Sequence, residues 1–320
     1  QNLQYNPQEI MIAAGARPVI YSIFKALVNP NDNVIFPVPS WNNNHYTYLN
    51  GATPIIIQTS EKNNFMPSVQ DIEPHLKDAH FLALCSPQNP TGTVFTKKGL
   101  EEICDAVIEE NRRRSQFDKP LYVMYDQIYS ELTYGVDHVN PVTLRPEMRE
   151  YTIFVDGISK NLSATGVRVG WSMGPKPIID KMKAILTHIG AWAPRAEQIA
   201  TAKYFQNFAD YNQFIVIQKY KILERLNELH KGIQKLKSDG FSVDSIEPQA
   251  GIYLTVKFDL SGKSSKKGNV LFNNEDVRKY LLDDAKLGIV PFYAFGTSHE
   301  SPWYRMSVGT LKTTDIPYLL

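Results

Sequence analysis

Several polar residues stand just beyond short apolar runs, where they could do chemistry together. Asn89 follows HFLALCS, Asp126 ends LYVMYD, and Lys160 comes three residues after TIFVDG. Tyr129 lies three residues beyond Asp126, and Arg168 lies eight beyond Lys160. Each has an ordinary explanation when taken alone, such as a helix cap, a solvated charge or a turn. Because an unpaired buried charge is costly, a strand-end Asp, Lys and Arg found together indicate a site for an anionic, polar ligand.

The apolar runs that carry these residues alternate with helical patterns from residue 16 to about 190. Near-continuous apolar strands separated by helices predict an α/β fold, with a mostly parallel sheet covered by helices on both faces. In such a sheet, functional residues gather at the carboxyl ends of the strands. The predicted strands are 33–38, 53–58, 80–86, 121–126, 152–157 and 167–173.

The last third of the chain has a different character. A helical pattern covers roughly 195–237, and Gly240 is its expected C-terminal stop. Beyond it, the sequence predicts β structure at 241–258 and 303–309, a polar loop at 261–269 and a helix at 276–288. We therefore expect a large α/β domain over 1–212 and a smaller α+β domain over 213–320, which begins with the end of the interdomain helix.

Composition argues against several classes of partner. Lys and Arg number 34 against 33 Asp and Glu, so we expect neither a nucleic-acid partner nor an anionic membrane surface. No apolar run reaches the ~20 residues that span a bilayer. Cys85 and Cys104 have no partner motif, which predicts a reducing, cytoplasmic setting. The histidines show no metal-ligand spacing, so we expect no metal. Because the chain opens on Gln1 rather than Met, we expect it to be a piece of a longer protein.

The motifs around these residues, taken in order, resemble a known family. They are similar to the pyridoxal-phosphate-dependent aminotransferases of fold type I (class I/II), in particular to the aspartate aminotransferase group. Each motif is moderately specific, and their co-occurrence along nearly the whole chain is strongly so. The matching stretches are GAR at 15–17, PSWNNNHY at 39–46, SPQNPTG at 86–92, DQIY at 126–129, SK at 159–160 with GVRVG at 166–170, and YRMSVG at 304–309.

The resemblance implies a seven-stranded type of sheet and gives the central residues roles that their chemistry supports. Lys160 would form the Schiff base with pyridoxal 5′-phosphate and then move a proton on the substrate, which needs a primary amine with a depressed pKa. Asp126 would keep the pyridine nitrogen protonated. Tyr129 and Asn89 would bond the 3′ oxygen of the cofactor, and Ser159 would also contact the cofactor.

The same resemblance implies that the remaining residues would bind the cofactor phosphate and the substrate. Gly15, Ala16 and Arg17 would present a helix N-terminus to the phosphate, and Arg168 would add a permanent charge. Trp41 would stack on the cofactor ring and border the substrate with Asn89. Arg305 would hold the substrate α-carboxylate.

Arg17 bears on substrate choice. In one branch of the family, a basic residue at this place contacts the distal carboxylate of acidic substrates. A guanidinium suits that contact, which favours aspartate or glutamate with a 2-oxo acid as acceptor. The alternative is that Arg17 faces solvent or a neighbouring residue.

Two departures from the family pattern stand out. The long N-terminal segment that usually precedes the GAR stretch is not present, and Gly157 occupies a place where many members carry a phosphate-binding Ser or Thr. The resemblance also implies a homodimer. It leaves open another reaction on the same scaffold, such as a β-lyase or decarboxylase, and a non-catalytic, cofactor-binding regulatory protein.

Overall fold

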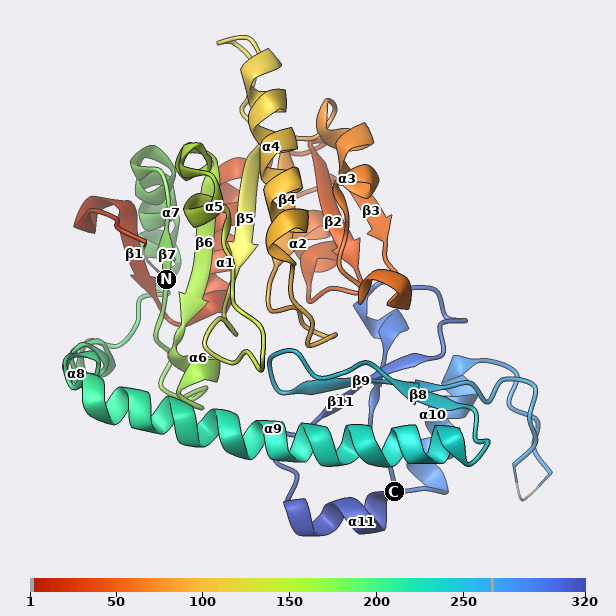
Figure 1. Ribbon diagram of the computed structural model, residues 1–320. Helices are drawn as coiled ribbons and strands as arrows, with labels where there is room; N and C mark the ends of the chain where they lie inside the picture. The colour runs from red at the N-terminus through yellow and green to blue at the C-terminus, as the bar shows by residue number, and fades with distance from the viewer. Residues whose placement is uncertain (1–2, 266–267) are drawn as a thin grey trace.

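A seven-stranded sheet forms the centre of the larger part of the molecule (Figure 1). The computed structural model describes residues 3–265 and 268–320, so part of the polar loop predicted at 261–269 lies outside the described residues. The strand order is β1-β7-β6-β5-β4-β2-β3. The strands are β1 (Ile10–Ala13), β2 (Asn33–Val38), β3 (Thr53–Gln58), β4 (Phe81–Cys85), β5 (Tyr122–Asp126), β6 (Thr152–Gly157) and β7 (Gly170–Met173).

All pairings in this sheet are parallel except those of β7. Strand β7 runs antiparallel to both β6 and β1. The carboxyl ends of β1, β4, β5 and β6 and the beginning of β7 therefore lie at the same edge of the sheet. Figure 1 shows that this edge faces the C-terminal part of the chain.

Helices cover both faces of the sheet, as the sequence predicts. One core cluster combines the sheet with α1 (Ala16–Leu27) and α7 (Lys176–Ile189). The other combines it with α3 (Val69–Leu76) and α4 (Lys97–Arg113). Strand β4 is almost entirely apolar because both of its faces are buried. Phe81 and Ala83 pack in the first cluster, while Leu82 and Leu84 pack in the second.

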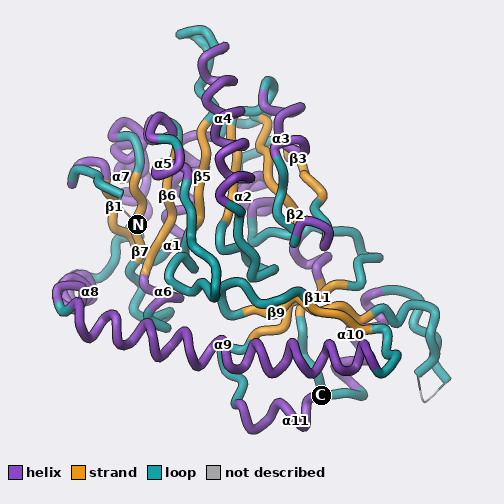
Figure 2. The backbone as a smooth tube through the Cα atoms, viewed as in Figure 1, coloured by secondary structure: helices purple, strands orange, loops and turns teal. Residues whose placement is uncertain are grey.

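A four-stranded antiparallel sheet of order β10-β11-β9-β8 forms the smaller part. Its strands are β8 (Val243–Ser245), β9 (Tyr253–Phe258), β10 (Val290–Pro291) and β11 (Trp303–Ser307). Helices α10 (Asn274–Asp283) and α11 (Ile316–Leu319) accompany it, and α9 (Phe208–Ser238) runs beneath both sheets (Figure 2). The predicted boundary at 212/213 falls within α9 and stays a prediction.

Short elements complete the chain. The remaining helices are α2 (Asn43–Leu49), α5 (Pro141–Leu144), α6 (Ile158–Asn161) and α8 (Arg195–Gln206). The 3₁₀ turns are η1 (Pro7–Glu9), η2 (Glu61–Asn63), η3 (Pro146–Glu150), η4 (Phe292–Phe295) and η5 (Thr313–Asp315). Within the described ranges, no helix is long and apolar enough to cross a membrane.

Several sequence expectations differ from the structure: the strand predicted at 167–173 begins at Gly170, and the helix predicted at 276–288 ends at Asp283. Strand β1 was not among the predicted strands, because four residues are too few to show an alternating pattern and its pairing with β7 is distant in sequence. The helix predicted at 195–237 is two helices separated at Asn207. The Asn207 side chain accepts a hydrogen bond from Asp210 N and so caps the start of α9. Gly240 does follow the helix end, with a φ of 93°.

Candidate active site

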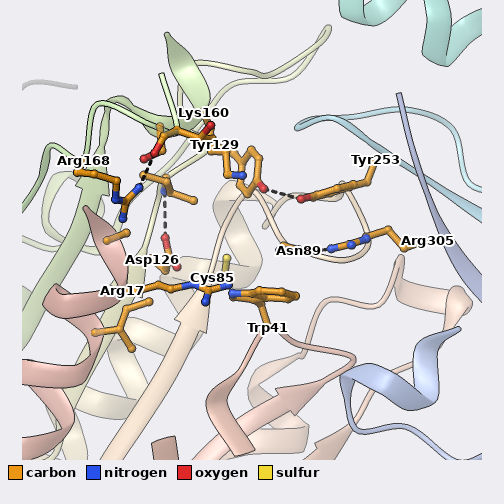
Figure 3. A pocket seen from close by; sticks show the side chains of 15 residues that line it. Arg17, Trp41, Cys85, Asn89, Asp126, Tyr129, Lys160, Arg168, Tyr253 and Arg305 are labelled. Atoms are coloured by element: carbon orange, nitrogen blue, oxygen red, sulfur yellow. Dashed lines mark hydrogen bonds between the residues drawn. The ribbon is translucent and has the colours of Figure 1, made fainter. Parts of the chain in front are cut away.

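A cavity of about 320 Å³ opens where the edge of the large sheet meets the small one. It has the size of a small-molecule site. All the sequence-predicted site residues line it except Gly15, which lies behind Arg168. Figure 3 shows Arg168 and Arg305 entering from opposite sides, with Lys160, Tyr129 and Asp126 between them. The lining consists of Ala16, Arg17, Ile20, Trp41, Cys85, Asn89, Asp126, Ile128, Tyr129, Ser159, Lys160, Thr165, Arg168, Tyr253 and Arg305.

Arg168 is held against the beginning of α1. Its Nη2 donates to Ala14 O at 2.8 Å and its Nη1 donates to Thr165 O at 2.6 Å. Gly15 has a φ of 92°, and a Cβ there would lie 2.2 Å from Arg168 Nη2. The positive φ favours glycine at this position, and a Cβ would displace the guanidinium of Arg168 from its present place. The free N–H groups at the start of α1 and Arg168 together form an anion-binding end of the cavity.

Close backbone contact explains Gly157, the departure from the family pattern noted above. A Cβ at Gly157 would lie 2.9 Å from Gly170 Cα and 2.9 Å from Val169 O. A Cβ at Gly170 would in turn lie 2.6 Å from the carbonyl carbon of Gly15. The two glycines let β6, β7 and the loop before α1 meet without intervening side chains.

Arg305 forms the opposite end. Its guanidinium carbon lies 4.4 Å from the ring centre of Tyr253, 4.9 Å from that of Phe295 and 5.8 Å from that of Trp41. Its Nη1 donates to Asn89 Oδ1 at 2.9 Å. Its Nε is buried and has no hydrogen-bond partner among the described residues. Arg305 is thus surrounded by aromatic rings and keeps a buried N–H group free to donate a hydrogen bond. Such an arginine is suited to a carboxylate ligand.

The Pro-rich turn fixes Asn89 by bonding to the small sheet. Within the turn, Gly92 N donates to Gln88 O at 2.8 Å. Outside it, Ala250 N donates to Gly92 O at 2.8 Å and Thr255 Oγ1 donates to Thr91 O at 2.8 Å. The turn therefore joins the carboxyl end of β4 to the segment that leads into β9.

Lys160 lies at the centre, on the short helix α6. Its Nζ is 5.8 Å from the ring centre of Tyr129, whose hydroxyl is hydrogen-bonded to that of Tyr253 at 2.9 Å. Burial and the charges of Arg305, Arg17 and Arg168 lower the pKa of Lys160, while Asp126 acts in the opposite direction. A lysine in these surroundings is more readily available as the neutral amine.

Asp126 is the one carboxylate of the cavity lining. It accepts a hydrogen bond from Ile128 N at 3.1 Å. Burial raises the pKa of Asp126 to about 6, although the Ile128 bond and Lys160 partly offset this. A cation placed beside Asp126 would stabilise its ionised form.

A second buried acid, Asp156, lies behind this group and was not predicted. It accepts hydrogen bonds from Gly157 N at 2.7 Å and from Gln127 Nε2 at 3.2 Å. Burial raises the pKa of Asp156 to about 8, and the charge of Asp126 contributes in the same direction. An Asp within the otherwise apolar run TIFVDG was the available sequence signal.

Tyr253 and Cys85 are the other lining residues of note that sequence reasoning missed. Cys85 is the register neighbour of Asp126 and lies near the end of the strand predicted at 80–86, so its position was available from the sequence. Tyr253 comes from the small sheet, and no sequence pattern places it against Tyr129. Among the described residues, no cluster of three or more His, Cys, Asp and Glu side chains could hold a metal ion.

The cavity fits pyridoxal phosphate on its own chemistry. Arg168 and the α1 N-terminus offer an anion site at one end, Arg305 offers a vacant donor at the other, and Lys160 and Asp126 lie between them. Such a set of groups on an α/β fold is suited to an enzyme that binds a phosphorylated aldehyde cofactor and a carboxylate substrate.

Comparison with known proteins identifies the family. The model of the family "Aminotransferase class I and II" matches residues 1–320, so the chain belongs to that family. It is accordingly a pyridoxal-phosphate-dependent aminotransferase of fold type I, which confirms the resemblance in the motifs.

Individual relatives agree with this placement. The chain is 31% identical over 315 residues to a probable aspartate/prephenate aminotransferase of Rickettsia typhi. The match covers 97% of this chain and 74% of that protein. It is 28% identical over 298 residues to an aspartate aminotransferase of Bacillus sp. (strain YM-2), with 92% and 71% covered. The aspartate aminotransferase structure from Rhizobium meliloti has the same fold, with a TM-score of 0.88 over 100% of this chain and 76% of that one at 23% identity.

Because the turn contacts the small sheet at Gly92, we expect Gly92→Ala to lower the free energy of unfolding substantially. Gly92 has a φ of 69°, and a Cβ there would lie 2.7 Å from Tyr253 O and 2.9 Å from Ala250 O. Gly135 has the same φ of 69° with nothing within 4 Å, so Gly135→Ala is a matched control for backbone strain. In urea unfolding, we expect Gly92→Ala to lower the free energy of unfolding by ~1–3 kcal/mol more than Gly135→Ala does. Equal losses would contradict the close contact.

Asp156 predicts a pH dependence of stability. Because its pKa is raised from 3.8 to about 8 on folding, its contribution favours the folded state at low pH and is lost as pH rises through that window. The stability of Asp156→Asn relative to the unsubstituted protein should therefore improve steadily from pH 5 to pH 8, as measured by thermal unfolding without cofactor. The exposed Asp283→Asn is the control, and a difference that does not change with pH would refute the prediction.

Proposed function

We propose that this aminotransferase takes its amino group from a dicarboxylic amino acid, aspartate or glutamate, and transfers it to a 2-oxo acid. The observation that carries the proposal is that Arg17 and Arg305 both line the cavity and that, within the described part of the chain, neither has a carboxylate partner. Arg17 has no hydrogen-bond or ion-pair partner among the described residues, and its guanidinium lies 5.6 Å from the ring centre of Trp41. Two separate guanidinium groups suit a ligand with two carboxylates.

The roles of the two arginines differ by their surroundings. Arg305 is enclosed by aromatic rings and fixed by Asn89, so it suits the α-carboxylate, which every amino acid substrate has. Arg17 is exposed in the first turn of α1 and suits a distal carboxylate that only some substrates have. The names of the relatives, which include aspartate aminotransferases, support the same substrate class.

The cofactor would be held by residues from several elements. Arg168, Gly15, Ala16 and Ser159 would hold its phosphate end, and Trp41 would cover its ring. When bound, pyridoxal phosphate supplies an aldehyde that accepts the amino group and a ring that withdraws electrons from the reacting carbon. Asp126 would hold the proton on the ring nitrogen, and the Asn89 and Tyr129 side chains would bond the 3′ oxygen.

Lys160 would act as both anchor and base. Its lowered pKa favours a neutral Nζ. A neutral amine could remove the proton from the substrate Cα and deliver a proton to the C4′ carbon of the cofactor. Tyr129 lies beneath this amine and would limit the directions in which it can move. The aromatic rings near Arg305 would reduce the access of water to the same reaction.

We also propose that the enzyme is a cytoplasmic homodimer that acts in amino-acid metabolism. Both cysteines are unpaired, which suits a reducing compartment. Helix α9 exposes a ridge of large apolar residues spaced by multiples of four: Phe208 is 69% exposed, Val216 66% and Tyr220 67%. Such a face is suited to a second copy of the chain.

A single-turnover experiment tests the substrate proposal. Protein loaded with pyridoxal phosphate and mixed with L-aspartate alone should release one equivalent of 2-oxo acid per site. Arg17→Met should lower kcat/KM for aspartate by about 10–100-fold, since a charged hydrogen bond of ~1.5–3 kcal/mol is lost. The value for L-alanine, which lacks the distal carboxylate, should change by less than about threefold, whereas Arg305→Met should impair both substrates. An equal loss for both amino acids in Arg17→Met would refute the assignment of Arg17.

Light scattering coupled to size-exclusion chromatography tests the dimer. The 36.4-kDa chain should elute at about twice its mass, and the double change Phe208→Glu with Val216→Glu should convert it to monomer by placing charge on the α9 ridge. Phe272→Glu is the control, because that residue is 76% exposed but lies on the small-sheet side. A dimer that survives the double change would place the interface elsewhere.

A further inference from the structure

Gln218, on the interdomain helix α9, bonds to the main chain of Lys160. Its Nε2 donates to Lys160 O at 3.0 Å and to Ser163 Oγ at 2.8 Å. We propose that Gln218 is a positioning residue, which places the amine of Lys160 by fixing the carbonyl of the same residue. The inference rests on the proposed role of Lys160.

The segment around Lys160 needs such support. Helix α6 has only four residues, Ile158–Asn161, and so few residues do not hold a helix by themselves. It is followed by Ser163, whose φ of 51° is uncommon for a residue other than glycine. Within the segment, Lys160 O accepts a bond from Ser163 N at 3.2 Å, so Gln218 reinforces a strained turn from outside.

The orientation of the Gln218 amide is fixed by its neighbours. Its Oε1 is buried and has no hydrogen-bond partner among the residues that the structure describes. The reverse orientation would place this oxygen against Lys160 O, and two acceptors repel each other. Leaving a buried oxygen unpaired is costly, so the two donor bonds to the Lys160 segment decide how the side chain lies.

Helix α9 is anchored in the small part of the molecule one turn beyond Gln218. Ile222 and Leu226 pack in the core cluster that contains β9 and β11. Arg225 Nη1 donates to Val308 O and to Leu311 O, both at 2.9 Å. Strand β11 carries Arg305, so a short stretch of α9 joins the residue that would hold the substrate carboxylate to the carbonyl of Lys160. The position of the lysine is thereby tied to that of the small sheet.

The test is Gln218→Met, which keeps the side-chain length and removes the donor. In the cofactor-free protein, amide hydrogen exchange of residues 159–165 should accelerate by about tenfold or more. In the loaded protein, kcat should fall by about tenfold, with a change in KM for aspartate of less than about threefold. The visible absorbance of the bound cofactor should change with pH, and the midpoint of this change should rise in the variant. The reason is that a less constrained Lys160 moves away from the arginines that depress its pKa.

Gln234→Met is the matched control on the same helix. Gln234 Nε2 donates to Asp244 Oδ1 at 2.9 Å and to Ser245 O at 3.1 Å, far from Lys160 in sequence. This change should lower the unfolding temperature but leave exchange at 159–165, the pH midpoint and kcat at their original values. Unchanged exchange and midpoint in Gln218→Met, or the same changes in Gln234→Met, would overturn the proposal.

Borohydride reduction of the loaded protein separates this inference from the proposed role of the lysine. Reduction should fix the cofactor on Lys160 in the unsubstituted protein and in Gln218→Met, as peptide mapping would show. Cofactor fixed on another lysine would overturn both the role of Lys160 and the positioning role of Gln218. Cofactor fixed on Lys160, with unaltered exchange and pH midpoint in Gln218→Met, would overturn the positioning role alone.

Discussion

Mutual repulsion among cations in one cavity is the constraint on which the rest of the site depends. Arg17, Lys160 and the two arginines at the ends of the cavity share it with a single lining carboxylate, Asp126. Like charges gathered at a partly dry site cost free energy, which the two core clusters on either face of the sheet must offset. The same repulsion lowers the pKa of Lys160. A ligand that brings negative charge relieves this repulsion, so binding an anionic cofactor and a carboxylate substrate would also stabilise the folded chain.

The antiparallel direction of β7 brings these charges to one edge. If β7 ran parallel to its neighbours, the loop after β6 would have to end at the far edge of the sheet, and Arg168, two residues before β7, would lie there. Instead, the chain leaves β6, carries Lys160 on α6 and enters β7 beside the start of α1. Gly157 and Gly170 allow this contact, since a Cβ on either would lie within 3 Å of main-chain atoms. The missing hydroxyl at Gly157 thus follows from packing, and under the proposed function Arg168 with the α1 N-terminus would hold the phosphate.

The sequence allowed more of the large sheet and its edge to be predicted than of the second half of the site. Asn89, Asp126 and Lys160 stand at or just beyond the carboxyl ends of three largely apolar, mutually parallel strands, so their gathering follows from parallel topology alone. Tyr253 and Gln218 could not be placed in this way, because their positions depend on how the small sheet and α9 pack against the large one. Asn207 shows the opposite case: its cap on Asp210 N was readable, but a continuous helical pattern on both sides concealed the break. Contacts within an element or at a sheet edge are predictable from local pattern, whereas contacts between the two sheets depend on tertiary packing.

Asn89 shows how the two halves of the site are joined. Its Oδ1 accepts from Arg305 Nη1, while its Nδ2 has no hydrogen-bond partner within the described ranges. One amide can therefore orient the arginine for a substrate carboxylate and still donate to the cofactor side of the cavity. The turn that holds Asn89 is bonded to the main chain at Ala250 and to the Thr255 side chain, so it moves with the small sheet as well as with β4. The stiff Pro87-Gln88-Asn89-Pro90 sequence is understandable on this basis: an amide that would serve both ligands has to keep one position relative to Lys160 on one side and Arg305 on the other.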